Sequence, residues 1–326
     1  MSRYDEHAQY DRPKRRTRPR TKERPVYENA VEASVLTVDR GRYTCRIGDA
    51  DQLVTAVKAR PLGRKSVIVG DRVRLDGDTS GDEGTLARIV EVETRETLLR
   101  RSADDDDPVE RPLVANADQL VIVVAVANPE PRPRLIDRCL VAAYDAGLDP
   151  LLCLTKTDLA DPEPLLATYR PLGVEAVSTQ RDGDLTEVSE SLKDRTSVLV
   201  GHSGVGKSTL VNALVPGADR AIGVVNDVTG RGRHTSTSAQ ALRLPFGGWI
   251  IDTPGIRSFG LAHVEPRRLI EAFPDLAAET RDCPRGCTHA ETEPECALDT
   301  AVAESRLDAE RVASYRRILA SREGRD

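Results

Sequence analysis

The residues best suited to chemistry lie in a glycine-rich stretch in the second half of the 326-residue chain. The stretch matches G-x-x-x-x-G-K-[ST], a pattern whose glycines let backbone N–H groups surround phosphates. A predicted strand, Ser197–Val200, enters it, and a predicted helix, Lys207–Leu214, leaves it with its positive N-terminal end toward the phosphates. Lys207 is expected to reach the β- and γ-phosphates, and Ser208 to ligate Mg²⁺. The predicted phosphate-binding residues are Gly201, His202, Ser203, Gly204, Val205, Gly206, Lys207, Ser208 and Thr209.

A second motif lies downstream, where an apolar strand ends in Asp252-Thr-Pro-Gly255. Asp252 is placed to hold Mg²⁺ through water, and the Gly255 amide to sense the γ-phosphate. The segment between the two motifs, Gly223–Thr237, is polar and rich in Gly, Arg and Thr. This composition favours a switch loop that offers a threonine hydroxyl to Mg²⁺, with Thr235 as first choice and Thr237 as second.

A motif for the base lies upstream of the phosphate loop. The predicted strand Pro150–Leu154 runs into Thr-Lys-Thr-Asp, which resembles the guanine motif Asn-Lys-x-Asp of GTPases. Asp158 would accept hydrogen bonds from guanine N1 and N2, and Lys156 would pack its stem along the base. Thr155 replaces the usual Asn, as Thr does in Rho-type GTPases. Val177-Ser178-Thr179 resembles the last base-contacting loop, which is usually Ser-Ala. The residues expected at the base are Thr155, Lys156, Thr157, Asp158 and Ser178.

The order of these motifs is circularly permuted. Ordinary GTPases begin with the phosphate loop and end with the base motifs, whereas here both base motifs come first. A sheet whose termini lie close together can be cut and rejoined in this way without changing its spatial assembly. One consequence is that the chain after Gly255 leads directly into the next domain.

A Cys/His cluster near the C-terminus predicts a metal site. Three thiols and one imidazole within fourteen residues make a closed tetrahedral set, typical of structural zinc without hydrolytic chemistry. The local sequence is rich in turns, so metal binding would supply folding energy that a small core does not. The other cysteines are isolated and expected to be buried thiols: Cys45, Cys139 and Cys153. The predicted zinc ligands are Cys283, Cys287, His289 and Cys296.

Strand and helix patterns divide the chain into four parts. Residues 1–30 form a basic, Pro-containing tail expected to be disordered; residues 31–101 contain five short strands typical of an OB-fold barrel. Ser102–Arg111 is acidic and is predicted to be a linker. Residues 112–260 alternate strands and helices around a parallel sheet, and residues 261–326 form the zinc-binding, helical end. The fold class is therefore multidomain: a β-barrel, an α/β P-loop domain and a small zinc-binding α-helical domain.

Charge and hydropathy bear on partners and compartment. The net charge is −6, yet residues 1–30 carry nine Lys or Arg against five acids, which suits contact with RNA phosphates. On the barrel, charge at Arg60, Arg64 and Lys65 would have to carry RNA binding, because Tyr43 is the aromatic available for stacking. A structural barrel without RNA contact is the alternative. No apolar run is long enough to span a membrane and no signal core is present, so a cytoplasmic protein is expected.

The last predicted helix, Thr300–Ala320, carries four arginines. They would present basic charge to RNA or belong to a solvated helix face, and the sequence does not separate these two readings. The four residues are Arg306, Arg311, Arg316 and Arg317.

The whole pattern resembles the ribosome small-subunit-dependent GTPase A family, also called RsgA or YjeQ, over roughly residues 30–320. The resemblance rests on the permuted order, the phosphate loop, Gly232-Arg-His-Thr235, Asp252–Gly255 and the Cys/His cluster behind an OB-like region. It implies a late assembly factor that binds the 30S subunit and its 16S rRNA through the barrel and zinc domains, with GTP hydrolysis stimulated there. The gaps of three residues between the first two cysteines and six before Cys296 each differ by one from the family's usual spacing.

The resulting hypothesis is a monomeric GTPase that uses GTP/GDP, Mg²⁺ and one structural Zn²⁺. Lys207 and Thr235 are the expected catalytic residues, together with His234 as a candidate that orients the attacking water. Ile256 stands where Ras-like enzymes carry a water-orienting Gln, so slow intrinsic turnover is expected. Two alternatives remain: a GTP-dependent RNA-binding switch with only incidental hydrolysis, and an ATP-using kinase or ATPase, which Asp158 argues against.

Overall fold

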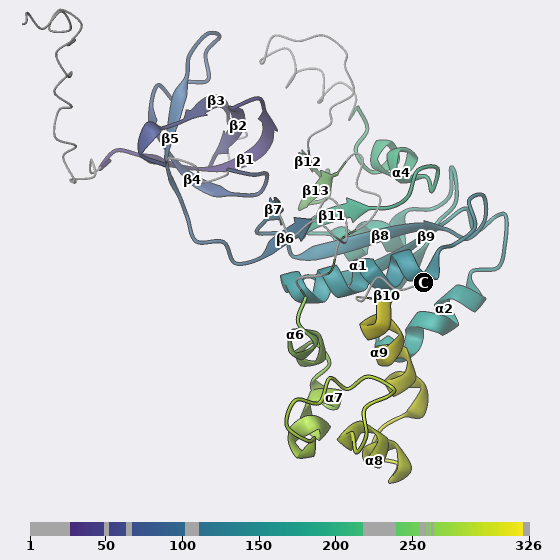
Figure 1. Cartoon of the computed structure of the whole chain (residues 1–326). Coiled ribbons are helices and arrows are strands. Elements are labelled where there is room, and N and C mark those ends of the chain that lie inside the picture. Colours follow the sequence, from purple (N-terminus) through teal and green to yellow (C-terminus); the bar gives the residue numbers. More distant parts are fainter. Residues whose placement is uncertain are drawn as a thin grey trace, which may run out of the picture.

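The computed structural model has three parts along the chain (Figure 1). A small barrel comes first, a central sheet with helices follows, and a group of short helices ends the chain. The structure describes residues 27–48, 52–62, 67–101, 111–217, 239–253, 259, 261 and 264–321.

The N-terminal barrel is closed, as the sequence predicts. Its strands pair in the order β1-β2-β3-β5-β4, and β4 pairs back with β1; every pairing is antiparallel except β3 with β5. Alternate side chains such as Val35, Cys45 and Ile89 point inward and are fully buried, which gives the barrel its own core. The strands are β1 (Val31–Asp39), β2 (Arg42–Ile47), β3 (Gln52–Lys58), β4 (Arg72–Gly77) and β5 (Ala87–Val92), with a 3-10 turn at Arg60–Leu62.

The central sheet has the order β10-β9-β8-β11-β13-β12. The first five strands are parallel, and β12 runs antiparallel to β13. The strands are β8 (Gln119–Ala125), β9 (Asp149–Thr155), β10 (Glu175–Ser178), β11 (Thr196–Val200), β12 (Gln240–Arg243) and β13 (Trp249–Asp252).

Helices cover both faces of this sheet. Leu120 and Ile122 pack in the core shared with α1, whereas Val121 and Val123 pack in the core shared with α3 and α4. Burial on both faces explains why β8 is a continuous apolar run instead of an alternating one. The helices are α1 (Pro133–Ala146), α2 (Glu163–Tyr169), α3 (Thr186–Leu192) and α4 (Lys207–Leu214), with a 3-10 turn at Arg170–Leu172.

The barrel and the sheet are joined by backbone pairing. Thr37 of β1 pairs with Gln240 of β12, so one sheet runs through both parts. A hairpin of β6 (Leu98–Arg101) and β7 (Arg111–Ala115) lies at the junction. The predicted linker Ser102–Arg111 is therefore flanked by paired strands, and its last residue already belongs to β7. Residues 102–110 lie outside the described part of the chain.

The C-terminal part is helical, and two of its helices, α6 and α9, pack on α1 (Figure 1). The prediction of one helix over Thr300–Ala320 is wrong, because α8 ends at Ala303 and α9 begins at Ala309. Ser305 has a φ of +58°, and Asp308 Oδ1 accepts hydrogen bonds from the amides of Glu310 and Arg311, which caps the new helix. The elements are α6 (Pro266–Glu271), α7 (Pro274–Glu279), a 3-10 turn (Thr280–Asp282), α8 (Ala297–Ala303) and α9 (Ala309–Ser321).

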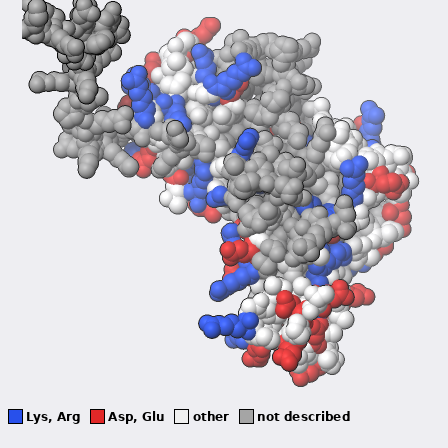
Figure 2. Space-filling view, in the orientation of Figure 1, with Lys and Arg blue, Asp and Glu red and all other residues white. Residues whose placement is uncertain are grey.

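The four C-terminal arginines do not form an unneutralised basic face. Each forms an ion pair with at least one carboxylate, and Figure 2 shows acidic side chains gathered over the C-terminal helices. These four arginines are therefore ion-paired, a state that neither of the two alternatives from the sequence described. The pairs are Arg306 with Glu279 and Glu304, Arg311 with Asp275, Arg316 with Asp299, and Arg317 with Asp137.

Among the described residues, no helix combines the length and apolar character needed to cross a bilayer.

Two glycines with the same backbone conformation allow a test of how tightly the barrel fits the sheet. Gly70 and Gly84 have φ values of +87° and +85°, but a Cβ on Gly70 would lie 1.9 Å from the Ala115 carbonyl oxygen, whereas one on Gly84 meets nothing within 4 Å. We expect Gly84→Ala to cost about 1 kcal/mol of folding free energy from the positive φ alone. Gly70→Ala should cost about 3 kcal/mol or more, because backbone atoms must move. Denaturant unfolding measures both, and equal losses would show that the junction is loose.

Candidate nucleotide and metal sites

The loops that leave β9, β11 and β13 meet at one edge of the sheet, because parallel strands have their carboxyl ends on the same side. They enclose a cleft of about 800 Å³. Most predicted phosphate and base residues line it, although Thr157, Ser178 and Val205 do not. The predicted residues that line the cleft are Thr155, Lys156, Asp158, Gly201, His202, Ser203, Gly204, Gly206, Lys207, Ser208, Thr209 and Asp252.

The phosphate loop depends on its glycines for shape. Gly204 and Gly206 have φ values of +85° and +94°, in the region that side-chain-bearing residues rarely adopt. A Cβ on Gly201 would lie 2.6 Å from the Val123 carbonyl oxygen. Gly206 is the N-cap of α4, and no side chain caps that helix end. The first amides of α4 therefore face the cleft as donors for an anion.

Two residues with opposite charges meet in the cleft. The Lys207 ammonium forms an ion pair with the Asp252 carboxylate, and both side chains are largely buried. Parallel pairing of β11 with β13 sets this arrangement, because Leu199 lies opposite Asp252. The next residue, Thr253, donates its hydroxyl to the Leu199 carbonyl at 2.7 Å and fixes the end of β13. The residue expected at the phosphates and the one expected at Mg²⁺ are thus side by side.

Thr155 connects the base motif to the phosphate loop. Its buried hydroxyl donates to the Val205 carbonyl at 2.5 Å and lies 3.3 Å from that of Val124. Lys156 has a φ of +59°, and its ammonium contacts the Asn128 carbonyl at the end of β8. Asp158 is exposed at the cleft, as a residue that accepts hydrogen bonds from a ligand must be. A threonine thus supplies the tie between the two loops.

The sequence analysis missed the wall of the cleft beyond the base motif. Leu159 is 51% exposed, which is unusual for a large apolar side chain, and it lines the cleft with the segment that follows β10. Thr179, not Ser178, lines the cleft, because Ser178 still belongs to β10. The only signal in the sequence that could have indicated this wall was the apolar residue directly after Asp158. The missed lining residues are Leu159, Gln180, Arg181, Asp182, Gly183, Leu185, Leu210 and Ala213.

Several predicted residues lie outside the described part of the chain: His234, Thr235, Thr237, Gly255, Ile256, Arg64 and Lys65.

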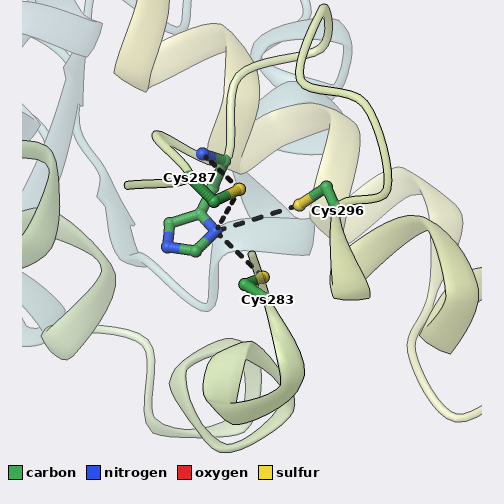
Figure 3. A group of neighbouring side chains, drawn as sticks. Cys283, Cys287 and Cys296 are labelled. Carbon is green, nitrogen blue, oxygen red and sulfur yellow. Dashed lines mark hydrogen bonds between the residues drawn. The ribbon is translucent and has the colours of Figure 1, made fainter. Parts of the chain in front are cut away.

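The predicted metal ligands converge (Figure 3). The sulfurs of Cys283 and Cys287 each lie 3.5 Å from His289 Nδ1, and that of Cys296 lies 3.8 Å away. All four ligand atoms lie within 4.8 Å of one another. A tetrahedral zinc ion with Zn–S distances of about 2.3 Å and Zn–N of about 2.0–2.1 Å would separate sulfur from nitrogen by about 3.5 Å. The four side chains therefore fit a tetrahedral metal ion.

The surroundings of the cluster act in two directions on the metal-binding forms of these side chains. The Ala297 amide donates to Cys283 Sγ at 3.3 Å, and the His289 amide to Cys287 Sγ at 3.4 Å, which stabilises thiolates. Burial lowers the pKa of His289, so its imidazole is neutral and free to coordinate. Burial also raises the pKa of Cys287 to about 12, so without a metal the thiol holds its proton and a metal must displace it.

The three isolated cysteines are buried thiols, as expected. Burial raises the pKa of each to about 12, which leaves them unreactive.

The fold and the cleft define a P-loop nucleotide-binding protein whose base motif precedes its phosphate loop. An RsgA GTPase family model matches residues 92–262, more than half of the chain. The chain belongs to the RsgA GTPase family.

Curated relatives agree with this assignment. A protein of Ectopseudomonas mendocina is 48% identical over 224 residues, 65% of this chain and 64% of the relative. A protein of Azotobacter vinelandii is 43% identical over 268 residues, 78% of this chain and 75% of the relative. Both are named small ribosomal subunit biogenesis GTPase RsgA. The aligned part thus spans just under two thirds of the first relative and three quarters of the second.

Solved structures show the same architecture. YjeQ from Thermotoga maritima is 28% identical, with a TM-score of 0.68 over 91% of this chain and 100% of that protein. YloQ, described as a circularly permuted GTPase, is 24% identical with a TM-score of 0.66 over 92% and 97%, a likeness of fold alone.

The Thr155 hydroxyl can be removed at almost constant volume. Thr155→Val leaves the Val205 carbonyl without this donor and loosens the base loop from the phosphate loop, so we expect about tenfold weaker GDP binding. Thr157→Val is the matched control, because its hydroxyl bonds to the Thr179 carbonyl at 3.3 Å and does not reach the phosphate loop. Fluorescent GDP titration measures both. An equal loss of GDP affinity in the two variants would contradict a specific role for the hydrogen bond between Thr155 and Val205.

Proposed function

We propose that this chain is a GTPase that acts in biogenesis of the small ribosomal subunit, and that the cleft at Gly201–Thr209 is its GTP site. The observation that carries the proposal is the direct bond between the base motif and the phosphate loop, through Thr155 and Val205. The two loops meet in one cleft although their order in the chain is reversed. Membership of the RsgA GTPase family supports GTP as the nucleotide.

The residues of the cleft suit GTP hydrolysis by positioning and charge. The amides at the start of α4 bind the phosphate oxygens, and Lys207 exchanges the Asp252 carboxylate for the β- and γ-phosphates. Asp158 accepts hydrogen bonds from guanine N1 and N2, and Lys156 lies beside the base. Ser208 and Asp252 line the same cleft and are the residues that would hold Mg²⁺, the latter through water. Bound Mg²⁺ would supply positive charge that offsets charge developing on the phosphates.

Three proposed residues complete the site from the switch region. Thr235 is proposed to ligate Mg²⁺ in the triphosphate state, and the Gly255 amide to sense the γ-phosphate. His234 is proposed to orient the attacking water.

The Cys/His cluster is proposed to hold one structural zinc ion. Three thiolates and an imidazole leave no open coordination position, so the metal stabilises the C-terminal fold and does no hydrolytic chemistry. The chain provides an anchor behind the ligands, because Arg316 Nε donates to the His289 carbonyl at 3.2 Å and its guanidinium pairs with Asp299.

The proposed partner is the small subunit with its 16S rRNA, met by a cytoplasmic monomer. The relatives' names support the subunit as partner. On the barrel, exposed Arg42, Arg60 and Arg88 can contact phosphates. Tyr43 is 6% exposed and faces the barrel interior, so it does not stack on bases. Any rRNA contact by this barrel face therefore depends on charge and shape.

GTP turnover titrated with purified small subunits tests the function. We expect turnover to rise with subunit concentration and saturate, while large subunits have no such effect. Lys207→Ala should lower stimulated turnover about 100-fold, because one preorganised charge on the phosphates is lost. A single-turnover experiment separates the alternative: GTP-dependent subunit binding without faster hydrolysis would indicate an RNA-binding switch. Absence of both binding and stimulation would contradict the ribosomal role.

Metal analysis of purified protein tests the zinc assignment. The intact chain should hold about one zinc per molecule, because the four ligands form a single closed set. Cys287→Ser should lose most of that zinc and destabilise the C-terminal helices. Cys139→Ser is the control, since it changes a buried thiol outside the cluster. Full zinc retention in the Cys287 variant, measured by elemental analysis, would contradict the assignment.

A further inference from the structure

Arg138 is a charged residue that lies inside the protein, on α1, outside the nucleotide cleft. It is 8% exposed, and a charged group is rarely buried so deeply unless it is hydrogen-bonded or paired. Its Nη2 donates to the main-chain carbonyl of Phe259, and its Nη1 donates to that of Ser321 at 3.3 Å. The first acceptor follows β13 in the sequence, and the second is the last residue of α9. One guanidinium therefore joins two distant parts of the chain.

The Phe259 end of this connection lies across a small cavity from the phosphate loop. Phe259 is 1% exposed, and with Gly201, His202 and Val205 it borders a small apolar cavity of about 30 Å³. Ile136 of α1, two residues before Arg138, lines the same cavity. Phe259 packs in the same core cluster as Val200, the last residue of β11 before the phosphate loop, and the cavity between them is only about large enough for one water molecule. A shift larger than this gap, in the phosphate loop or in the chain after β13, is therefore transmitted to Phe259.

The Ser321 end of the connection lies in the helix that supports the metal ligands. Through Arg316, α9 holds the His289 carbonyl. A second contact docks α9 on α1: Arg317 pairs with the buried Asp137 carboxylate at 3.3 Å. Arg317 and Arg138 thus both attach α9 to α1. Only Arg138 also contacts Phe259, whereas Arg317 pairs with Asp137.

We propose that Arg138 is a positioning residue that couples the nucleotide site to the C-terminal metal unit. The inference rests on the proposed GTPase function. A guanidinium is planar and its N–H groups point in fixed directions, so one placement of Phe259 relative to Ser321 satisfies both bonds. When Phe259 moves with the nucleotide, its hydrogen bond with Arg138 is stretched, and α9 moves to keep that bond or its last turn opens. Nucleotide state then reaches the metal unit through side-chain contacts as well as along the backbone.

The test is amide hydrogen exchange in the last turns of α9, in the full-length protein with its metal, with GDP and with a non-hydrolysable GTP analogue. In the unaltered chain we expect exchange there to differ about fivefold or more between the two nucleotides, the lower end of typical couplings. Arg138→Lys keeps the charge, but a single ammonium does not span both carbonyls, so the ratio should fall to about 1. Arg138→Met should give the same ratio without the charge.

Arg317→Met is the matched control. It removes the Asp137 pair and so weakens the docking of α9, which raises exchange with both nucleotides, yet the ratio between them should persist because Arg138 still holds Phe259. Three outcomes would overturn the inference. The exchange ratio between the two nucleotides could persist in Arg138→Lys, it could be lost equally in Arg317→Met, or it could be absent in the unaltered chain with nucleotide bound. Fluorescent GDP binding is measured first and tests the proposed function separately. If no guanine nucleotide binds, both the proposed GTPase function and the coupling through Arg138 are contradicted.

Discussion

Parallel pairing of β9, β8, β11 and β13 is the constraint on which the rest of the structure depends. It places the carboxyl ends of these strands at one edge, and each end carries a loop with a distinct chemical task. Thr155 is the last residue of β9, Gly201 directly follows β11, and Asp252 is the last residue of β13. The cleft is therefore a property of strand order in space, and the order of the strands in the chain has no effect on it. This is why a permuted sequence still brings the base motif and the phosphate loop into one cleft.

The sequence predicted most strongly where chemistry leaves little choice. The phosphate loop needs glycine at particular backbone conformations, and Gly204 and Gly206 have the positive φ values that require it. The four predicted metal ligands lie within 4.8 Å of one another, as the Cys/His pattern predicted, although their spacing in the chain differs from the family's usual one. The five barrel strands and the parallel strands of the sheet were predicted, because alternating or continuous apolar runs report which faces are buried, but the short antiparallel strand β12 was not.

Features that depend on contacts between distant segments were not predictable from local pattern. The pairing of Thr37 with Gln240, and the ion pairs of Arg311 and Arg317 with Asp275 and Asp137, join residues far apart in the chain. The break between α8 and α9 was missed for a different reason. Arg306 and its neighbours continue a helical pattern, and the N-cap residue Asp308 was outweighed by that pattern. Leu159 was passed over because an isolated exposed leucine is common on protein surfaces.

The two strands nearest the barrel connect the nucleotide site to both flanking parts. Barrel strand β1 pairs with β12, and Arg46 of β2 lies 5.0 Å from the ring centre of Trp249, the first residue of β13. The far end of β13 carries Asp252 in the cleft, and the chain that follows it leads through Phe259 to the C-terminal helices. In an unpermuted order, the chain after this strand would continue into the rest of the nucleotide domain. Permutation instead makes β12 and β13 the shared attachment of the barrel, the cleft and the metal unit. Any displacement of this strand pair must therefore be accommodated at all three places.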